Sequence, residues 1–466
     1  MGKRRPRGRQ RSIWVASSEL PSSAGNPFYE RLNRVLDEAG FDAFAEEQCA
    51  KFYADGVGRP SLAPGRYFRM LLLGYFEGLD SERAIAWRAA DSLSLREFLD
   101  VALHEASPDH STVSRTRRRI DLETHEAVFT WVLQRLNDAG LVKGKTIGID
   151  ATTLEANAAM RSIVRRDTGE GYEAFLHGLA VASGIATPTR AELARLDRKR
   201  PKKGSNDDWT HPQDPDAKIT KMKDGRTHLA HKAEHAVDLE TGTVVGVTVQ
   251  DAHAGDTTTM VETLVTAAEQ VEAVLPAGGC IAEVVGDKGY HSNETMVALA
   301  ELGLRSYVSE PDRGRRCWKG KPLARAAVYA NRRRIRGARG KRLLRQRGER
   351  LERPNAHLYE TGGMRRVYLR GHANIRKRLL VQACGLNLGL LMRKVTGVGT
   401  PRSLQGRVDA LVAALIAALN GLWRLVAGLR APISPGSPDP VRIRRKTWLH
   451  QLGPVTLHRG HSATGC

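Results

Sequence analysis

Apolar residues recur every three or four positions from about residue 27 to about residue 137, which is the spacing of helices that bury one face. In the stretch RYFRMLLLGYFEG, Tyr67, Leu71 and Tyr75 fall on the same face of one such helix. Helices with buried faces must pack against one another to form a core. The pattern therefore predicts a compact, all-helical domain over residues 26–140.

After Lys145 the pattern changes to that of an α/β domain, in which strands show a period of two. KTIGIDAT has the pattern of one strand, HLAHKAEHAVDLETGTVVGVTVQ that of two strands joined by a turn at Glu240–Gly242, and CIAEVVGD that of another. Further along, NIRKRLLVQACGLNLGLLMRK predicts a helix with one broad apolar side. We expect this α/β domain to cover residues 141–394.

A long polar insertion over residues 156–226 divides the predicted α/β domain. Thr189 and Glu192 have the spacing of a capping box and predict the start of a basic helix within it. Because the segment lacks the alternation of a strand, we expect it to interrupt the sheet rather than extend it.

Both ends of the chain differ from these domains. Residues 1–25 form a basic arm, and residues 395–466 form an irregular tail. The tail holds one apolar run, ALVAALIAALNGLWRLVAGL, but Asn420, Gly421 and Arg424 interrupt it and leave too few apolar residues to cross a bilayer. We predict an amphipathic helix there and no membrane anchor.

The net charge of +22 over 466 residues is the strongest compositional signal, and nucleic acid is the usual partner of such a basic chain. The stretch SPDHSTVSRTRRRI offers Asp109 or Ser111 as the N-cap of a short helix. A helix of this kind can enter a DNA groove, although a solvated basic face has the same pattern. We predict DNA binding by its arginines, Arg115, Arg117, Arg118 and Arg119.

Five scattered cysteines show no spacing suited to zinc and indicate reduced cytosolic thiols. His228, His231 and His235 lie on one predicted strand and raise the alternatives of a zinc cluster or a channel for phosphate. We favour the channel.

Two aspartates stand at the ends of apolar strands. Ile147 and Ile149 point to one face of the first strand, so Asp150 points to the other, which must be wet, paired or bound to metal. Asp287 ends the later strand, and Lys288 directly after it can face a phosphate. An aspartate that merely starts a turn is the alternative at each position. Together, on a basic chain, the two predict ligands of a divalent cation.

A third acid is expected for a site of this kind, and the stretch RQRGERLERPNAH offers Glu349 and Glu352 on one helix face. Their spacing does not choose between them, since either can pair with a neighbouring arginine. The arginine-rich run that precedes them, with Arg345, is expected to bind backbone phosphates rather than bases.

The motifs GIDAT, VVGDKGY and ERLERPNAH…RRVYLRG…NLGLLMR, in this order, resemble the DDE transposases of bacterial insertion sequences. The resemblance covers about residues 64–394 and includes YFRMLLLGYFEG and DHSTVSRTRRR. It implies a ribonuclease H-like mixed sheet flanked by helices, after an N-terminal all-helical domain. By position, Asp150, Asp287 and Glu352 match the catalytic triad, which would hold two Mg²⁺ ions, or Mn²⁺ in their place.

The resemblance also implies an enzyme that binds the terminal inverted repeats of its element and target DNA, works as a homo-oligomer, and acts in the cytoplasm at the nucleoid. The chain departs from the family at Pro354 and Asn355, where a Ser-Phe pair is common. Proline bends a helix interior, so we expect distortion beside Glu352. A decayed copy that only binds DNA and a metal-dependent nuclease without strand transfer are the alternatives.

Overall fold

The computed structural model describes residues 25–54, 61–200, 204–275, 279–314 and 316–402. The predicted basic arm, apart from residue 25, lies outside the described residues. So does nearly all of the predicted tail, with its apolar run. Everything described below belongs to one compact unit of the chain.

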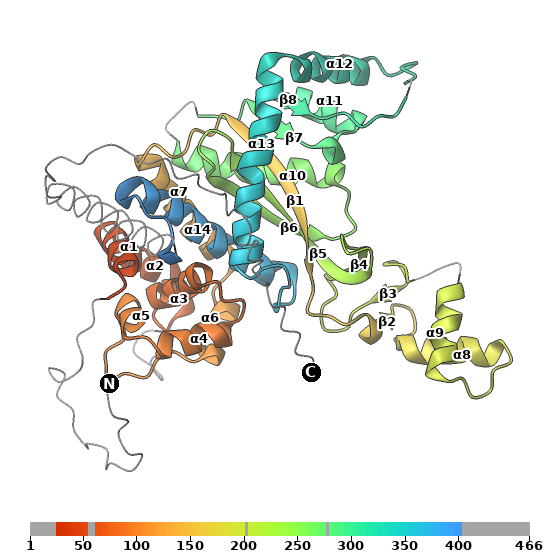
Figure 1. Ribbon diagram of the computed structural model, residues 1–466, viewed down its shortest axis with the longest axis horizontal. Helices are drawn as coiled ribbons and strands as arrows, with labels where there is room; N and C mark the ends of the chain where they lie inside the picture. Colours follow the sequence, from red (N-terminus) through yellow and green to blue (C-terminus); the bar gives the residue numbers. More distant parts are fainter. Residues whose placement is uncertain (1–24, 55–60, 201–203, 276–278, 315, 403–466) are drawn as a thin grey trace, which may run out of the picture. The chain divides into compact units, whose positions relative to one another are not determined.

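The N-terminal part is all-helical, as predicted (Figure 1). Its central helix is α3 (Pro64–Glu77), in which every residue from Tyr67 to Phe76 is buried. Ser81 caps the next helix by accepting a hydrogen bond from the backbone N–H of Ala84. The elements are α1 (Pro27–Glu38), α2 (Phe41–Cys49), η2 (Ala50–Phe52), α3, α4 (Glu82–Ala90), α5 (Leu93–Phe98), α6 (His110–Arg119) and α7 (Leu122–Asp138).

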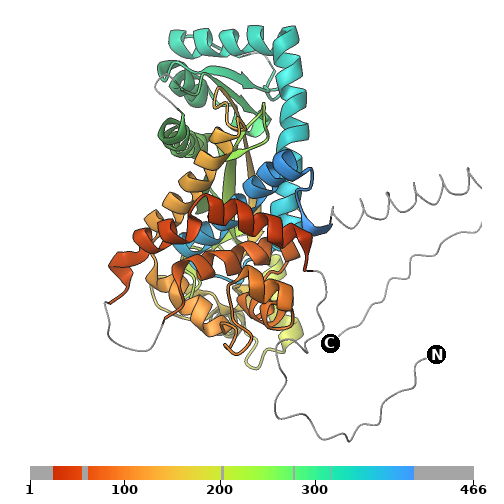
Figure 2. The ribbon, with the colours of Figure 1, turned by 90° about the vertical axis from the view of Figure 1, so that its left-hand side faces the viewer.

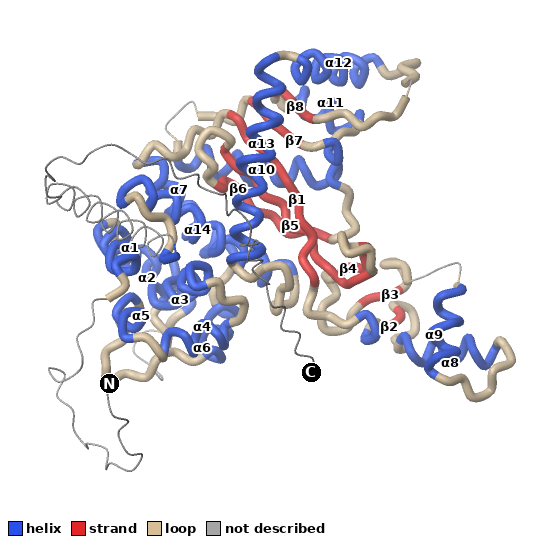
Figure 3. The backbone as a smooth tube through the Cα atoms, in the orientation of Figure 1, coloured by secondary structure: helices blue, strands red, loops and turns tan. Residues whose placement is uncertain are grey.

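A mixed sheet forms the centre of the second part (Figure 3). Its core strands are β1 (Thr146–Glu155), β5 (Thr227–Asp238), β6 (Val244–Asp251), β7 (Glu283–Gly286) and β8 (Arg305–Val308). They lie in the order β6-β5-β1-β7-β8, with β5 antiparallel to β1 and to β6, and with β7 parallel to β1 and to β8. This is the ribonuclease H-like arrangement that the resemblance implies.

Helices cover both faces of this sheet. Glu234 of β5 contacts α10 (Asp256–Val274), and its neighbour His235 contacts Tyr359 in the π-helical turn η5 (His357–Thr361). Because successive strand residues point to opposite faces, α10 and η5 lie on opposite sides. On the η5 side α13 (Ala338–Ala356) packs against β1, β7 and β8. It meets α12 (Pro322–Arg336) at a sharp angle, which Figures 1 and 2 show from two directions. The turn η4 (Lys288–Tyr290) and α11 (Asn293–Glu301) join β7 to β8.

The insertion holds η3 (Met160–Ser162), β2 (Val164–Arg165), α8 (Tyr172–Ala182), α9 (Arg190–Lys199), β3 (Trp209–Thr210) and β4 (Lys218–Lys221). The predicted capping box at Thr189 and Glu192 is present at the start of α9. The expectation that the insertion does not extend the sheet is wrong at its end, because β4 pairs with the first residues of β5. A four-residue strand on the sheet edge leaves little alternation to detect.

The last described helix, α14 (His372–Thr396), is buried on almost every side rather than on the single side that was predicted. It packs against β6 of the sheet and against α3 and α7 of the helical part. Its buried polar residues have hydrogen-bond partners both in the sheet and in the helical part. Asn387 exchanges hydrogen bonds with the backbone of Val244 in β6, and Lys377 donates to the carbonyl oxygens of Arg117 and Ile120.

Candidate active site

The parallel pairing of β1 with β7 brings Asp150 and Asp287 together. Thr146 lies opposite Glu283, and Gly148 lies opposite Val285. Continued by two residues, this register places Asp287, just past the end of β7, beside Asp150. Asp287 also accepts a hydrogen bond of 2.8 Å from the backbone N–H of Gly289 and so caps the turn η4. The two aspartates that the sequence placed at strand ends therefore share one edge of the site.

Helix α13 supplies the partners of Asp150. Arg347 donates from Nη2 to Oδ1 of Asp150 at 3.0 Å, and the same nitrogen lies 4.0 Å from Oδ2 of Asp287. Asn355 donates from Nδ2 to Oδ2 of Asp150, also at 3.0 Å. Sequence reasoning missed both partners. Their spacing could have revealed them, because Arg347, Leu351 and Asn355 are four residues apart and so lie on one helix face, which packs toward β1.

Burial raises the pKa of Asp150 above its usual range. The charge of Arg347 opposes this shift, whereas the nearby charge of Asp287 adds to it. A carboxylate in such surroundings gains from any additional positive charge that can replace water. The pair of aspartates thus has the electrostatics of a cation site.

Glu352, and not Glu349, lines the pocket that contains Asp150 and Asp287. Its exposed side chain has no ion-pair partner in the described part of the chain. The three other acids of this pocket have partners: Glu155 lies near Arg366, Glu360 near Arg365, and Asp224 near His228. Glu352 is therefore the acid of the pocket wall that is free to accept a cation.

Pro354 does not end the helix beside Glu352. It lies buried inside α13, which continues to Ala356 and then widens into the π-helical turn η5. The change from α-helical to π-helical geometry comes after both Glu352 and Pro354. Asn355 is the second position at which the sequence differs from the Ser-Phe pair that is common in the family. Its side chain directly contacts Asp150.

The donors of the pocket fit a hard divalent cation, although the described residues contain no group of three or more acids, histidines or cysteines close enough to hold one. Asp150 and Asp287 present carboxylate oxygens, and Glu352 adds another on the same wall. The Oδ1 atom of Asn355 is buried and has no hydrogen-bond partner among the described residues. Oxygen donors of this kind suit Mg²⁺ and Mn²⁺.

The three histidines of β5 have separate partners. His228 lies 3.0 Å from Asp224 and lines the pocket, whereas the buried His231 contacts Asp214. His235 contacts the hydroxyl group of Tyr359. This arrangement does not support the zinc alternative, and it leaves only His228 beside the predicted channel.

The predicted DNA-binding arginines divide into two groups. Asp109 caps α6, and Arg115, Arg118 and Arg119 are exposed on it. Arg117 is only 7% exposed and forms an ion pair with Glu82 of α4. The expectation that Arg117 contacts DNA does not fit this position. Lys288, beside Asp287, and Arg345, on α13, are exposed.

Two family models match the chain. The model described as Transposase domain (DUF772) matches residues 18–119, and the model described as Transposase DDE domain matches residues 204–388. The second match includes Asp287 and Glu352, while Asp150 precedes it. No curated protein and no solved structure matches.

These matches confirm the resemblance: the chain belongs to the DDE-type transposases of insertion sequences. Such proteins bind DNA and cut and transfer its strands, and the family generally uses divalent metal ions. None of the helices in the described part of this chain combines the length and apolar character needed to cross a lipid bilayer.

Proposed function

We propose that this transposase binds the ends of its insertion sequence and catalyses DNA cleavage and strand transfer with Asp150, Asp287 and Glu352 as the ligands of two Mg²⁺ ions. The observation that carries the proposal is the parallel register that sets Asp150 beside Asp287 in a pocket shared with Glu352. Mn²⁺ would substitute because it accepts the same oxygen donors.

Each acid has a role that follows from its place. Asp150 and Asp287 would hold the ions from the strand edge that they share, and Glu352 would hold them from α13 on the pocket wall. When bound, the ions activate a water molecule or a 3′-hydroxyl group and stabilise the leaving oxygen. Arg347, which contacts Asp150 and lies 4.0 Å from Asp287, would balance the charge of the two aspartates in the absence of a cation.

Basic side chains around the pocket support a DNA substrate. Lys223, Arg365 and Arg366 line the pocket itself, and each is exposed. Outside the pocket lining, the exposed cations Arg115, Arg118, Arg119, Lys288 and Arg345 would bind backbone phosphates of double-stranded DNA. We assign no DNA contact to Arg117. Paired transposon ends require at least two copies of the site, so we propose a homo-oligomer that acts on nucleoid DNA in the cytoplasm.

A cleavage and joining assay tests the proposal on DNA that carries the element's own terminal repeats. Mg²⁺-dependent nicking at the repeat ends and joining to a target are expected from the parent chain, and Asp150→Asn should remove both. Nicking without joining would favour a nuclease. End binding without any cleavage would favour a copy that has lost its chemistry.

A further inference from the structure

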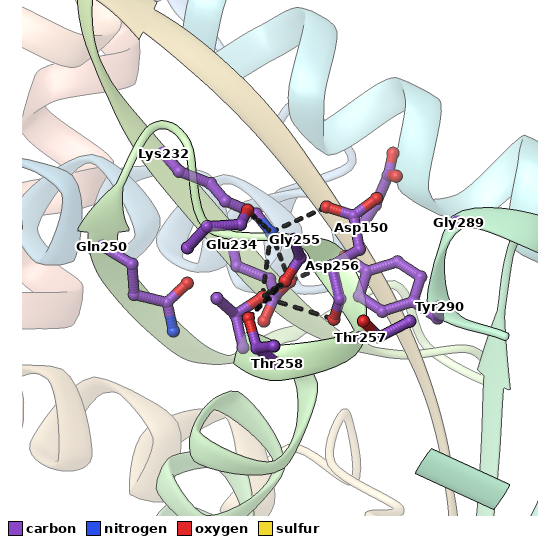
Figure 4. A network of polar contacts seen from close by, with 12 residues as sticks. Asp150, Lys232, Glu234, Gln250, Gly255, Asp256, Thr257, Thr258, Gly289 and Tyr290 are labelled. Carbon is purple, nitrogen blue, oxygen red and sulfur yellow. Dashed lines mark hydrogen bonds and ion pairs between the residues drawn. The ribbon is translucent and has the colours of Figure 1, made fainter. Parts of the chain in front are cut away.

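A network of buried polar side chains lies on the face of the sheet opposite α13 (Figure 4). At its centre Glu234 of β5 is fully buried. Its carboxylate accepts hydrogen bonds from the hydroxyl groups of Tyr290 at 2.8 Å and Thr259 at 3.0 Å, and also from Thr263. Burial raises the pKa of Glu234 and so opposes its charge. A buried acid of this kind is costly unless its partners are well placed.

Lys232 links this acid to the start of α10. Its Nζ atom lies 2.7 Å from Oδ1 of Asp256 and 3.9 Å from Oε1 of Glu234, and it donates to the hydroxyl of Thr259 at 2.9 Å. Replacing buried ion pairs by apolar side chains often leaves stability unchanged or increases it. A gain in stability alone is therefore a weak reason for a polar network at this place.

The network holds the turn that carries Asp287. Tyr290 is the last residue of that turn, and its hydroxyl ties it to Glu234. One residue earlier, Gly289 lies against Asp256 so closely that an added Cβ would be 2.5 Å from Oδ2 of Asp256 and 3.0 Å from Oδ1 of Asp287. The middle and the last residue of the turn are thus held from behind the sheet, while Asp287, directly before the turn, lines the pocket.

We infer that Glu234 and Tyr290, supported by Lys232 and Asp256, are positioning residues that set the Asp287 carboxylate against Asp150 for binding a divalent cation. The inference rests on the proposed function. Residues that orient a metal ligand without touching the metal commonly change metal affinity by about 10- to 100-fold when they are altered. The network should therefore control the affinity of the site for cations.

Tyr290→Phe tests this with little loss of packing, because it removes only the hydroxyl group. Tyr307→Phe is the matched control: its hydroxyl also donates to a buried glutamate, Glu283, at 3.2 Å, but at the start of β7. We expect about 10-fold weaker Mn²⁺ binding in Tyr290→Phe, measured by calorimetry on the full chain without DNA. Tyr307→Phe should bind as the parent does.

Gly289→Ala provides a second variant that displaces the turn by steric contact. It should also weaken Mn²⁺ binding and raise the Mg²⁺ concentration required for half-maximal cleavage. Unchanged Mn²⁺ affinity in both Tyr290→Phe and Gly289→Ala, or an equal loss in the Tyr307→Phe control, would overturn the inference. Absence of Mn²⁺ binding and of cleavage in the parent chain would instead contradict the proposed function itself.

Discussion

Arg347 and Asp150 are joined by a hydrogen bond of 3.0 Å between a helix and a strand that are almost 200 residues apart in the chain. The guanidinium group also lies 4.0 Å from Asp287, so one positive charge serves both aspartates. A cation that binds these carboxylates must compete with it.

We predict that Arg347→Met strengthens Mn²⁺ binding in the absence of DNA by about 10-fold or more. The reason is that a charge-assisted hydrogen bond contributes about 1.5–3 kcal/mol and no longer has to be broken. Arg345→Met, an exposed neighbour on the same helix, is the control and should leave the affinity unchanged. Weaker binding in Arg347→Met would mean that the arginine organises the carboxylates rather than competing for them.

Asp150→Asn and Asp287→Asn should each abolish cleavage while DNA binding stays nearly intact, because the basic surface is unaffected. Retained cleavage in either variant would remove that residue from the site. Gel-shift and nicking assays on the same DNA separate the two effects.

Asp150→Asn should also raise the free energy of unfolding at pH 7. The pKa of Asp150 is raised in the fold, so its neutral form is favoured there. That contribution to stability is fully present below the unfolded pKa of about 3.9 and is lost as pH rises through the folded pKa. An amide keeps the neutral state at every pH. A lower unfolding midpoint than that of the parent would show that the bonds to Arg347 and Asn355 outweigh burial.

Glu352→Gln should stop cleavage at every Mg²⁺ concentration, because it removes the only acid of α13 that lines the pocket. Glu349→Gln changes an exposed acid on the same helix and should cost no more than about 0 to 1 kcal/mol of stability. If instead the second variant is inactive and the first is active, the third ligand lies almost one helical turn earlier. If the parent is itself inactive, replacing Pro354 and Asn355 by Ser and Phe tests whether the departure from the family is the cause.

The arginines of α6 should separate into surface and core positions. Neutralising Arg118 and Arg119 together should lower the slope of log affinity against log salt by about 0.9 for each lost phosphate contact. Arg117→Gln should leave that slope unchanged but destabilise the fold by about 3–5 kcal/mol, because Glu82 would lose its partner in a mostly buried pair. Salt titrations of end binding and denaturant titrations measure the two quantities. An unchanged slope for the double variant would place this face in solvent rather than on DNA.

Two buried histidines should make the protein sensitive to mild acid. Burial lowers the pKa of His125 and of His235 to about 4. Each contributes stability that is fully present above the unfolded pKa of about 6.5 and is lost as pH falls toward 4, by at most about 1.4 kcal/mol per pH unit. Urea midpoints should therefore decrease steadily below pH 6.5. Constant midpoints down to pH 5 would contradict burial of these rings.

The sequence pointed to the acids of the candidate site but not to the side chains that contact them. Alternation in the first strand identified Asp150, but only pairing between segments 137 residues apart places Asp287 next to it. The dense arginines of α6 suggested that all four of them face DNA or solvent. Yet Val113, Thr116, Arg117 and Ile120 share the spacing of one buried face, and the structure buries all four. The many charged residues of α6 made the helical spacing of its buried face hard to recognise in the sequence.

The burial of α14 also could not be predicted from its own sequence. Its polar residues suggested a wet side, and only distant backbone groups, at Val244 and at Arg117, make their burial possible. Such groups cannot be found from local spacing, because they come from two different parts of the chain.

Because α14 packs against the sheet and against α3 and α7, the part that precedes residue 140 is not a detachable module. A gene fragment that ends there would leave the apolar surface of α3 without its cover and the carbonyl oxygens at the end of α6 without Lys377. Recombination between related elements can exchange only the segment that encodes the N-terminal helices. The new helices would then have to pack against the existing α14. The helix at the far end of the described chain thus restricts which front halves evolution can combine with a given catalytic core.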